Sequence, residues 1–104
     1  MRVAGIATDA DFLQGLKSQI GKRVRISYDV ELSESGAGRE TVEGRLTSVD
    51  AEVVLDESRL IHPSSKDDRL RRTAPLRAVR GYNVLDQRTG LVERTLLRPG
   101  LHPQ

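Results

Sequence analysis

The fold is decided by residues 21–32, which read GKRVRISYDVEL. After Gly21 and Lys22, apolar and polar residues alternate: Val24, Ile26, Tyr28, Val30 and Leu32 fall on one side of an extended chain, and Arg23, Arg25, Ser27, Asp29 and Glu31 on the other. A period of two is typical of a strand with one face on a core and one face in water. The stretch therefore predicts a long amphipathic strand.

The flanking residues extend this pattern on both sides. Upstream, apolar residues at helical spacing predict a helix over about 9–20, ended by Gly21 at a position that favours glycine. These apolar positions are Phe12, Leu13, Leu16 and Ile20. Downstream, residues 42–50 predict a second strand and residues 52–56 a short third one. Gly44 inside the second strand indicates a sharp bend or a close backbone approach, as small barrels require.

The second half of the chain is less regular. Residues 57–74 are polar and contain proline, which predicts a long variable loop. Apolar residues between 76 and 85 bracket Arg80 and Gly81, which predicts two short strands about a tight turn. Residues 86–90 predict a hairpin turn into a further strand. We expect one mainly β domain over residues 1–104, with a five-stranded barrel over about 22–97, an N-terminal helix and an extra C-terminal hairpin.

Composition argues against several classes of function. The 104 residues include no cysteine and two histidines, both beside proline, which argues against disulfides, thiolate metal sites and histidine-based triads. No nucleophile stands at a recognisable spacing from a base, and no Gly-rich phosphate loop occurs. We therefore expect no enzymatic activity, no metal, no cofactor and no small-molecule substrate. Because no apolar run reaches the length of a membrane span, we expect a cytoplasmic protein without a membrane partner.

Charge is distributed unevenly along the chain. Residues 1–57 contain seven basic and eleven acidic residues, and residues 58–104 contain ten basic and four acidic ones, so a net +2 combines −4 and +6. The basic excess lies at Lys66, Arg69, Arg71, Arg72, Arg77 and Arg80. These residues form either an ordinary solvated face or an electrostatic footprint for phosphates or for an acidic patch on a neighbouring subunit.

Over residues 12–86 the elements follow a recognisable order. A helix, Gly21-Lys22, an alternating strand, a Gly-containing strand ending at Asp50, a short apolar strand, a variable loop and Arg80-Gly81-Tyr82-Asn83-Val84 succeed one another. This order resembles the Sm and Sm-like (LSm) proteins, small β-barrels that assemble into RNA-binding rings. The resemblance implies an Sm-like or SH3-like barrel that forms a homo-oligomer.

The resemblance also implies a binding site for single-stranded, usually uridine-rich RNA. Two loops would hold the RNA, one bearing Asp50 and one bearing Arg80 and Gly81. Arginine supplies donors for phosphates or base edges, glycine admits close approach, and Asn83 would pair with bases or brace its loop. Two residues have alternatives: Tyr82 either stacks on a base or is a half-buried barrel residue, and Asp50 either lines the site or simply makes a turn. The basic residues Arg71, Arg72 and Arg77 complete the predicted RNA-binding set.

Two alternatives stay open. The strands at Gly21–Ile26, Gly44–Asp50 and Val53–Leu55 are also similar to the C-terminal domain of the bacterial ribosome-maturation factor. The leading functional hypothesis is an Sm-like RNA-associated homo-oligomer that contacts RNA through the Arg80-Gly81 loop. The alternative is a non-catalytic barrel that mediates protein–protein assembly, through self-association or a ribosome-maturation-like role, without specific RNA binding.

Overall fold

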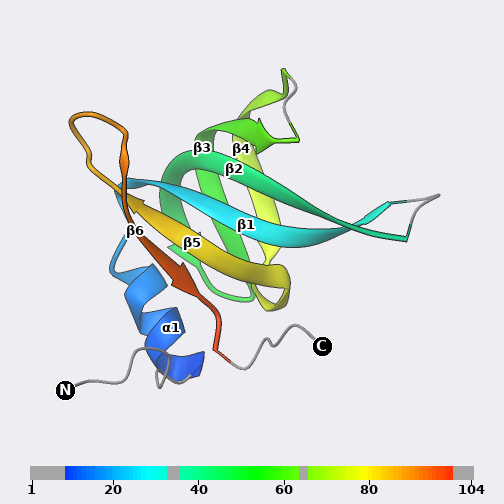
Figure 1. Cartoon of the computed structure of the whole chain (residues 1–104), viewed down its shortest axis with the longest axis horizontal. Helices are drawn as coiled ribbons and strands as arrows, with labels where there is room; N and C mark the ends of the chain where they lie inside the picture. The colour runs from blue at the N-terminus through cyan, green and yellow to red at the C-terminus, as the bar shows by residue number, and fades with distance from the viewer. Residues whose placement is uncertain (1–8, 33–35, 64–65, 100–104) are drawn as a thin grey trace.

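The chain forms a six-stranded antiparallel sheet with a short helix at its N-terminal end (Figure 1). The computed structural model describes residues 9–32, 36–63 and 66–99. Its elements are α1 (Asp9–Lys17), β1 (Arg23–Leu32), β2 (Gly36–Val49), β3 (Glu52–His62), β4 (Asp68–Pro75), the 3-10 turn η1 (Leu76–Ala78), β5 (Val79–Leu85) and β6 (Val92–Leu97). The strand order is β4-β3-β2-β1-β5-β6. The expected mainly β fold with an N-terminal helix is confirmed, but the sheet has six strands and is open, with β4 and β6 as its edges.

The alternating stretch on β1 forms the amphipathic strand that its pattern predicts. Val24, Ile26 and Tyr28 are between 0 and 5% exposed and belong to the core. The intervening residues point to the opposite face, where Arg25 lies directly across from Glu43 on β2. The sheet thus has an inner face on the core and an outer face of polar side chains.

Gly44 marks the place where β2 and β3 bend (Figure 1). A Cβ at this position would lie 2.9 Å from the carbonyl oxygen of Asp56 and 3.1 Å from Cα of Ser58, so only glycine lets the two backbones come this close. On β3, Glu57 adopts a φ of 50°, which is uncommon outside glycine, and the strand pairing is irregular here. The predicted close approach at Gly44 is confirmed.

The helix is shorter than the predicted span of 9–20. It ends at Lys17, and a turn then leads to Gly21, whose φ of 95° is one that glycine adopts without strain. Leu16 is fully buried as predicted. Ile20 is 45% exposed, because the early end of the helix turns it outward, and Gln19 is buried in its place.

Gly15 faces the sheet across a short distance. A Cβ on Gly15 would lie 2.6 Å from the hydroxyl oxygen of Tyr82 on β5. The Tyr82 ring also packs on Phe12, with 5.4 Å between the ring centroids. This glycine, which weakens the isolated helix, therefore lets α1 lie close against β5.

The predicted loop over 57–74 is largely strand. β3 continues to His62 and β4 begins at Asp68, so the connection between them is short, and residues 64–65 within it lie outside the described residues. The first four residues of β4, which start at Asp68, are all exposed because this strand is an edge of the sheet. Further along β4, Arg72 and Ala74 are buried, but an arginine at one of the two buried positions hides the alternation in the sequence.

The predicted turn at Arg80 and Gly81 is wrong, since both residues lie inside β5. Gly81 pairs with Ser27 on β1 and with Leu97 on β6. A Cβ on Gly81 would lie 2.8 Å from the carbonyl oxygen of Leu96, so the glycine serves the close approach of β6 rather than a turn.

The predicted C-terminal hairpin is confirmed. β6 pairs with β5 through a turn in which Oδ1 of Asp86 accepts hydrogen bonds from the backbone N–H groups of Arg88 and Thr89, at 2.7 and 3.1 Å. Gly90 then adopts a φ of 77°. An aspartate and a glycine at these positions are the residues that such a turn favours.

Candidate nucleic-acid interface

The predicted RNA-binding loop is part of strand β5, which carries Arg80, Gly81 and Asn83. The side chains of Arg80 and Asn83 make hydrogen bonds within the chain. Nη1 of Arg80 donates to a carboxylate oxygen of Asp29 at 3.0 Å. The amide of Asn83 donates to the hydroxyl of Thr95 on β6 at 2.7 Å. The structure thus places these residues on a strand surface that is braced by its neighbours.

Tyr82 points to the inner face of the sheet. Its side chain packs on Phe12, and the residue is 3% exposed. Burial raises the pKa of its hydroxyl. In this structure Tyr82 is a core residue, and its ring is not available to stack on a base.

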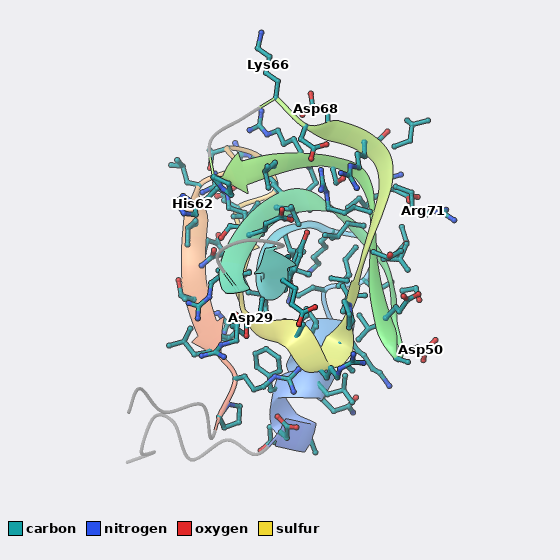
Figure 2. All side chains as sticks on the ribbon, turned by 90° about the vertical axis from the view of Figure 1, so that its right-hand side faces the viewer. Asp29, Asp50, His62, Lys66, Asp68 and Arg71 are labelled. Carbon is teal, nitrogen blue, oxygen red and sulfur yellow. The ribbon has the colours of Figure 1, made fainter. Side chains whose placement is uncertain are left out.

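Asp50 lies in the exposed turn between β2 and β3, where its backbone N–H donates to the carbonyl oxygen of Glu52 at 2.9 Å. Figure 2 shows Asp50 and Arg71 on one side of the view and Asp29, the partner of Arg80, on the other. The structure therefore does not bring Asp50 together with the residues on β5.

The predicted basic segment does not form one patch. Arg71 is exposed and pairs with Asp56 at 3.0 Å, whereas Arg72 is 5% exposed and donates to the backbone oxygen of Asp67 at 2.6 Å. Successive residues of a strand point to opposite faces, which separates these two neighbours. Arg77 lies exposed on η1.

Two pKa values near β4 are shifted by local contacts. A hydrogen bond from Arg69 lowers the pKa of Asp67. Burial, together with a hydrogen bond to Glu40 at 2.9 Å, raises the pKa of Tyr28 to about 12. Asp67 is thus held as an anion and Tyr28 as a neutral donor at neutral pH, which suits structural roles rather than proton transfer.

A larger basic surface, which was not predicted from the sequence, lies on the outer face of the sheet. We call it the arginine face, and it consists of Arg23, Arg25, Arg39, Arg45, Arg59 and Arg80. Strand register brings these residues together. On neighbouring strands, Arg23 lies directly across from Arg45, Arg25 and Arg59 lie on either side of Glu43, and Arg39 lies across from Asp29. The side chains of these arginines are between 30 and 57% exposed. The alternation of Arg23 and Arg25 with buried apolar residues was the available signal.

Glu43 organises the centre of the arginine face. Its side chain is 10% exposed, and its carboxylate oxygens lie 3.0 Å from Nε of Arg25, 3.4 Å from Nε of Arg23 and 3.9 Å from Nη2 of Arg59. One negative charge thus holds three positive ones. Each guanidinium has five N–H donors, so most of them remain for an outside acceptor.

The whole arginine face carries excess positive charge. Its six arginines contact three carboxylates: Arg80 and Arg39 contact Asp29 at 3.0 and 3.5 Å, Arg45 pairs with Glu57, and Glu43 holds the rest. A fourth carboxylate, Asp56, lies across from Arg45 and is paired with Arg71. Arginines fixed by carboxylates lose less conformational freedom when they bind an anion. The cross-strand neighbours Asn83 and Thr95 add neutral hydrogen-bonding groups beside Arg25. Such a surface suits a phosphate backbone with exposed base edges.

Other chemistry is not evident in the part of the chain that the structure describes. Within residues 9–32, 36–63 and 66–99, no group of three or more His, Cys, Asp or Glu side chains could hold a metal ion. No helix in these ranges is long and apolar enough to cross a membrane. Comparison of the chain with protein-family models, curated proteins and solved structures gives no match.

Proposed function

We propose that this chain is a non-catalytic, Sm-like protein that binds single-stranded RNA through the arginine face. The open, bent sheet is then a variant of the small Sm-like barrel in which β6 covers the outer edge of β5. The order of the described elements supports this assignment, since a helix, an alternating strand, a glycine-bent strand and a strand bearing Arg80 to Asn83 succeed one another.

The observation that carries the proposal is the arrangement around Glu43. A nearly buried carboxylate is surrounded by three arginines on a solvent-facing sheet surface, which leaves a fixed local excess of positive charge. A purely structural pair needs only one cation for each anion. The additional arginines are readily explained if they meet phosphates.

The proposal is tested by binding of a fluorescently labelled oligouridine over a salt series, measured by anisotropy. Binding of the protein releases cations that are condensed on the RNA phosphates. Because this release is less favourable at a higher salt concentration, we expect the affinity to fall as salt rises. The variant Arg39→Gln/Arg59→Gln removes two of the most exposed charges of the arginine face. Each lost phosphate contact on a single strand lowers the slope of log affinity against log salt by about 0.7, so this variant should lower it by about 1.4.

A matched control removes the same charge elsewhere. Arg77→Gln/Arg94→Gln changes two exposed arginines outside the arginine face. Arg77 lies on η1, and Arg94 lies across from the core residue Val84 and so points to the inner side of the sheet. We expect this control to bind like the parent chain. If both double variants lose affinity equally, binding follows net charge alone, and the proposed site is wrong.

The alternative function, protein assembly driven by the opposed charges of the two halves, gains less support. Arg71 pairs with Asp56 and Arg80 with Asp29, each at 3.0 Å. These pairs join the basic second half to the acidic first half inside one copy. Much of the charge that would attract a second copy is thereby already neutralised.

A further inference from the structure

A row of residues without an arginine or a carboxylate crosses the middle of the arginine face. Strand register places His62 of β3 across from Thr41 of β2. Thr41 lies in turn across from Ser27 of β1, and Ser27 lies across from Gly81 of β5. Residues directly opposite each other on neighbouring strands share one face of the sheet. These four residues therefore form one row, which we call the central row.

An arginine row lies on each side of the central row. In each arginine row two guanidinium groups contact one carboxylate: Arg25 and Arg59 contact Glu43, and Arg39 and Arg80 contact Asp29. Because Arg25, Ser27 and Asp29 are successive outward residues of β1, neighbouring rows are about 7 Å apart. Each nucleoside within a single strand of nucleic acid has a phosphate on both sides of its sugar. The three rows thus match the order phosphate, nucleoside, phosphate.

The middle of the central row carries two hydroxyl groups in contact. Oγ of Ser27 and Oγ1 of Thr41 are 2.8 Å apart, and both residues are partly exposed. One hydroxyl donates to the other, which leaves one O–H proton and several lone pairs for an outside partner. Among the described residues these hydroxyls make no further hydrogen bond. A ribose 2′-OH, which both donates and accepts, is a suitable partner, and deoxyribose lacks this group.

The two ends of the central row differ. His62 is exposed at the β3 end, where its aromatic ring offers a stacking surface for a base. At the β5 end Gly81 is buried, and Cδ2 of Leu97 lies 3.0 Å from the position of a Cβ on this glycine, so Leu97 covers this end. Figure 2 shows His62 and Asp29 on the same side of the view, opposite Arg71. The open part of the row is therefore the imidazole ring and the two hydroxyls.

We propose that the central row is a ribonucleoside subsite of the arginine face. The ribose 2′-OH hydrogen-bonds with the hydroxyls of Ser27 and Thr41, the base stacks on His62, and the two arginine rows hold the flanking phosphates. The RNA backbone then runs along the strands. This inference rests on the proposed function and adds to it the ability to distinguish RNA from DNA, which phosphate contacts alone do not supply.

The test compares labelled oligouridine with oligodeoxyuridine of the same length, by anisotropy at one salt concentration. We expect the parent chain to bind the ribose form about fivefold more tightly, which is the effect of one neutral hydrogen bond. Ser27→Ala/Thr41→Val removes both hydroxyls and should abolish this preference, while the affinity for oligodeoxyuridine stays the same. Because both partners of the hydrogen bond are removed together, no unpaired polar group remains, and the thermal unfolding should change little.

Two further variants separate the sugar from the base. Thr73→Val is the matched control, because it removes an exposed hydroxyl from β4, outside the central row, and it should keep the fivefold preference. His62→Ala should weaken the binding of both oligonucleotides equally, by about tenfold, since stacking involves the base and not the sugar.

The failure of the subsite and the failure of RNA binding give different results. The subsite is overturned if the parent chain binds both oligonucleotides equally, if Ser27→Ala/Thr41→Val keeps the preference, or if Thr73→Val loses it. It is also overturned if His62→Ala binds like the parent chain. In these cases salt-dependent binding to the arginine face still stands. A parent chain that binds neither oligonucleotide refutes the RNA proposal and the subsite together.

Discussion

Glu43 is the residue whose replacement best separates the stability of the arginine face from its binding. We consider Glu43→Gln, which keeps the shape of the side chain and removes its negative charge. The variant leaves Arg23, Arg25 and Arg59 around a neutral amide. We expect the folded state to lose stability, while affinity for oligouridine stays the same or increases because the face becomes more positive.

The expected loss follows from the contacts. Glu43 is nearly buried and accepts hydrogen bonds from Arg25 at 3.0 Å and Arg23 at 3.4 Å. Hydrogen bonds to charged groups contribute about 1.5–3 kcal/mol each. Because the arginine side chains are 30 and 38% exposed, water screens part of this, and we expect a net loss of about 2 kcal/mol. For a chain of this length, that corresponds to a fall of about 8 °C in the unfolding temperature.

Thermal unfolding followed by circular dichroism measures this loss, and Glu57→Gln is its control. Glu57 pairs with Arg45 on the same face, but both side chains are mostly in water, at 58 and 42% exposed. Such a pair contributes at most about 1 kcal/mol. The reasoning about Glu43 is refuted if both variants melt within about 2 °C of each other, or if Glu43→Gln binds oligouridine more weakly than the parent chain.

Three further predictions concern the core and its tyrosines. Gly15→Ala should lower the free energy of unfolding of the parent chain, since its Cβ would lie 2.6 Å from the Tyr82 hydroxyl oxygen. In a Tyr82→Phe chain, which lacks this oxygen, the same substitution should raise the free energy of unfolding by up to about 1 kcal/mol through helix propensity. Equal effects in the two chains would contradict this prediction. Because burial raises the pKa of both tyrosines, and that of Tyr28 to about 12, the folded chain should show less phenolate absorbance at pH 10 than the unfolded chain. The free energy of unfolding should then fall as the pH rises from 10 to 12, because Tyr28 loses its proton in the unfolded chain but keeps it in the folded chain. Normal titration of Tyr28 near pH 10 in the folded chain would be the opposing result. Arg98→Ala should lower the free energy of unfolding, measured with denaturant, by about 2 kcal/mol. The Arg98 side chain is 15% exposed, donates to two backbone carbonyl oxygens and lies 5.2 Å from the centroid of the Phe12 ring. A loss below about 0.5 kcal/mol, which is typical of a surface substitution, would argue against this prediction.

The parts of the fold that the sequence predicted correctly depend on local pattern. The alternation over β1, the glycine at the bend of β2 and the Asp86-to-Gly90 turn all act through neighbouring residues or through period. The errors depend on distant contacts. Gly81 looks like a turn residue, and only the approach of Leu96 from another strand explains why it lies inside β5. In β4 only Arg72 and Ala74 are buried, and the sequence shows no apolar alternation because one of these two residues is an arginine.

The candidate site was harder to predict for a related reason. Arg80 stood out through its neighbours in sequence, but its partner Asp29 is 51 positions away. Arg25 and Arg59 meet at Glu43 only because the register of three strands aligns them. Sequence period identified Arg23 and Arg25 as outward-facing. It could not show which cations on other strands would join them.

The two descriptions of charge in this chain lead to different expectations about binding. Counted along the sequence, the basic residues gather in the second half, yet Arg71 and Arg80 of that half are paired with acids of the first. Counted over the surface, the excess lies on one face, most of whose arginines come from the nominally acidic half. A polyanion meets surfaces rather than segments. Binding should therefore respond to the position of a lost charge on the arginine face, and not to the half of the chain from which it comes.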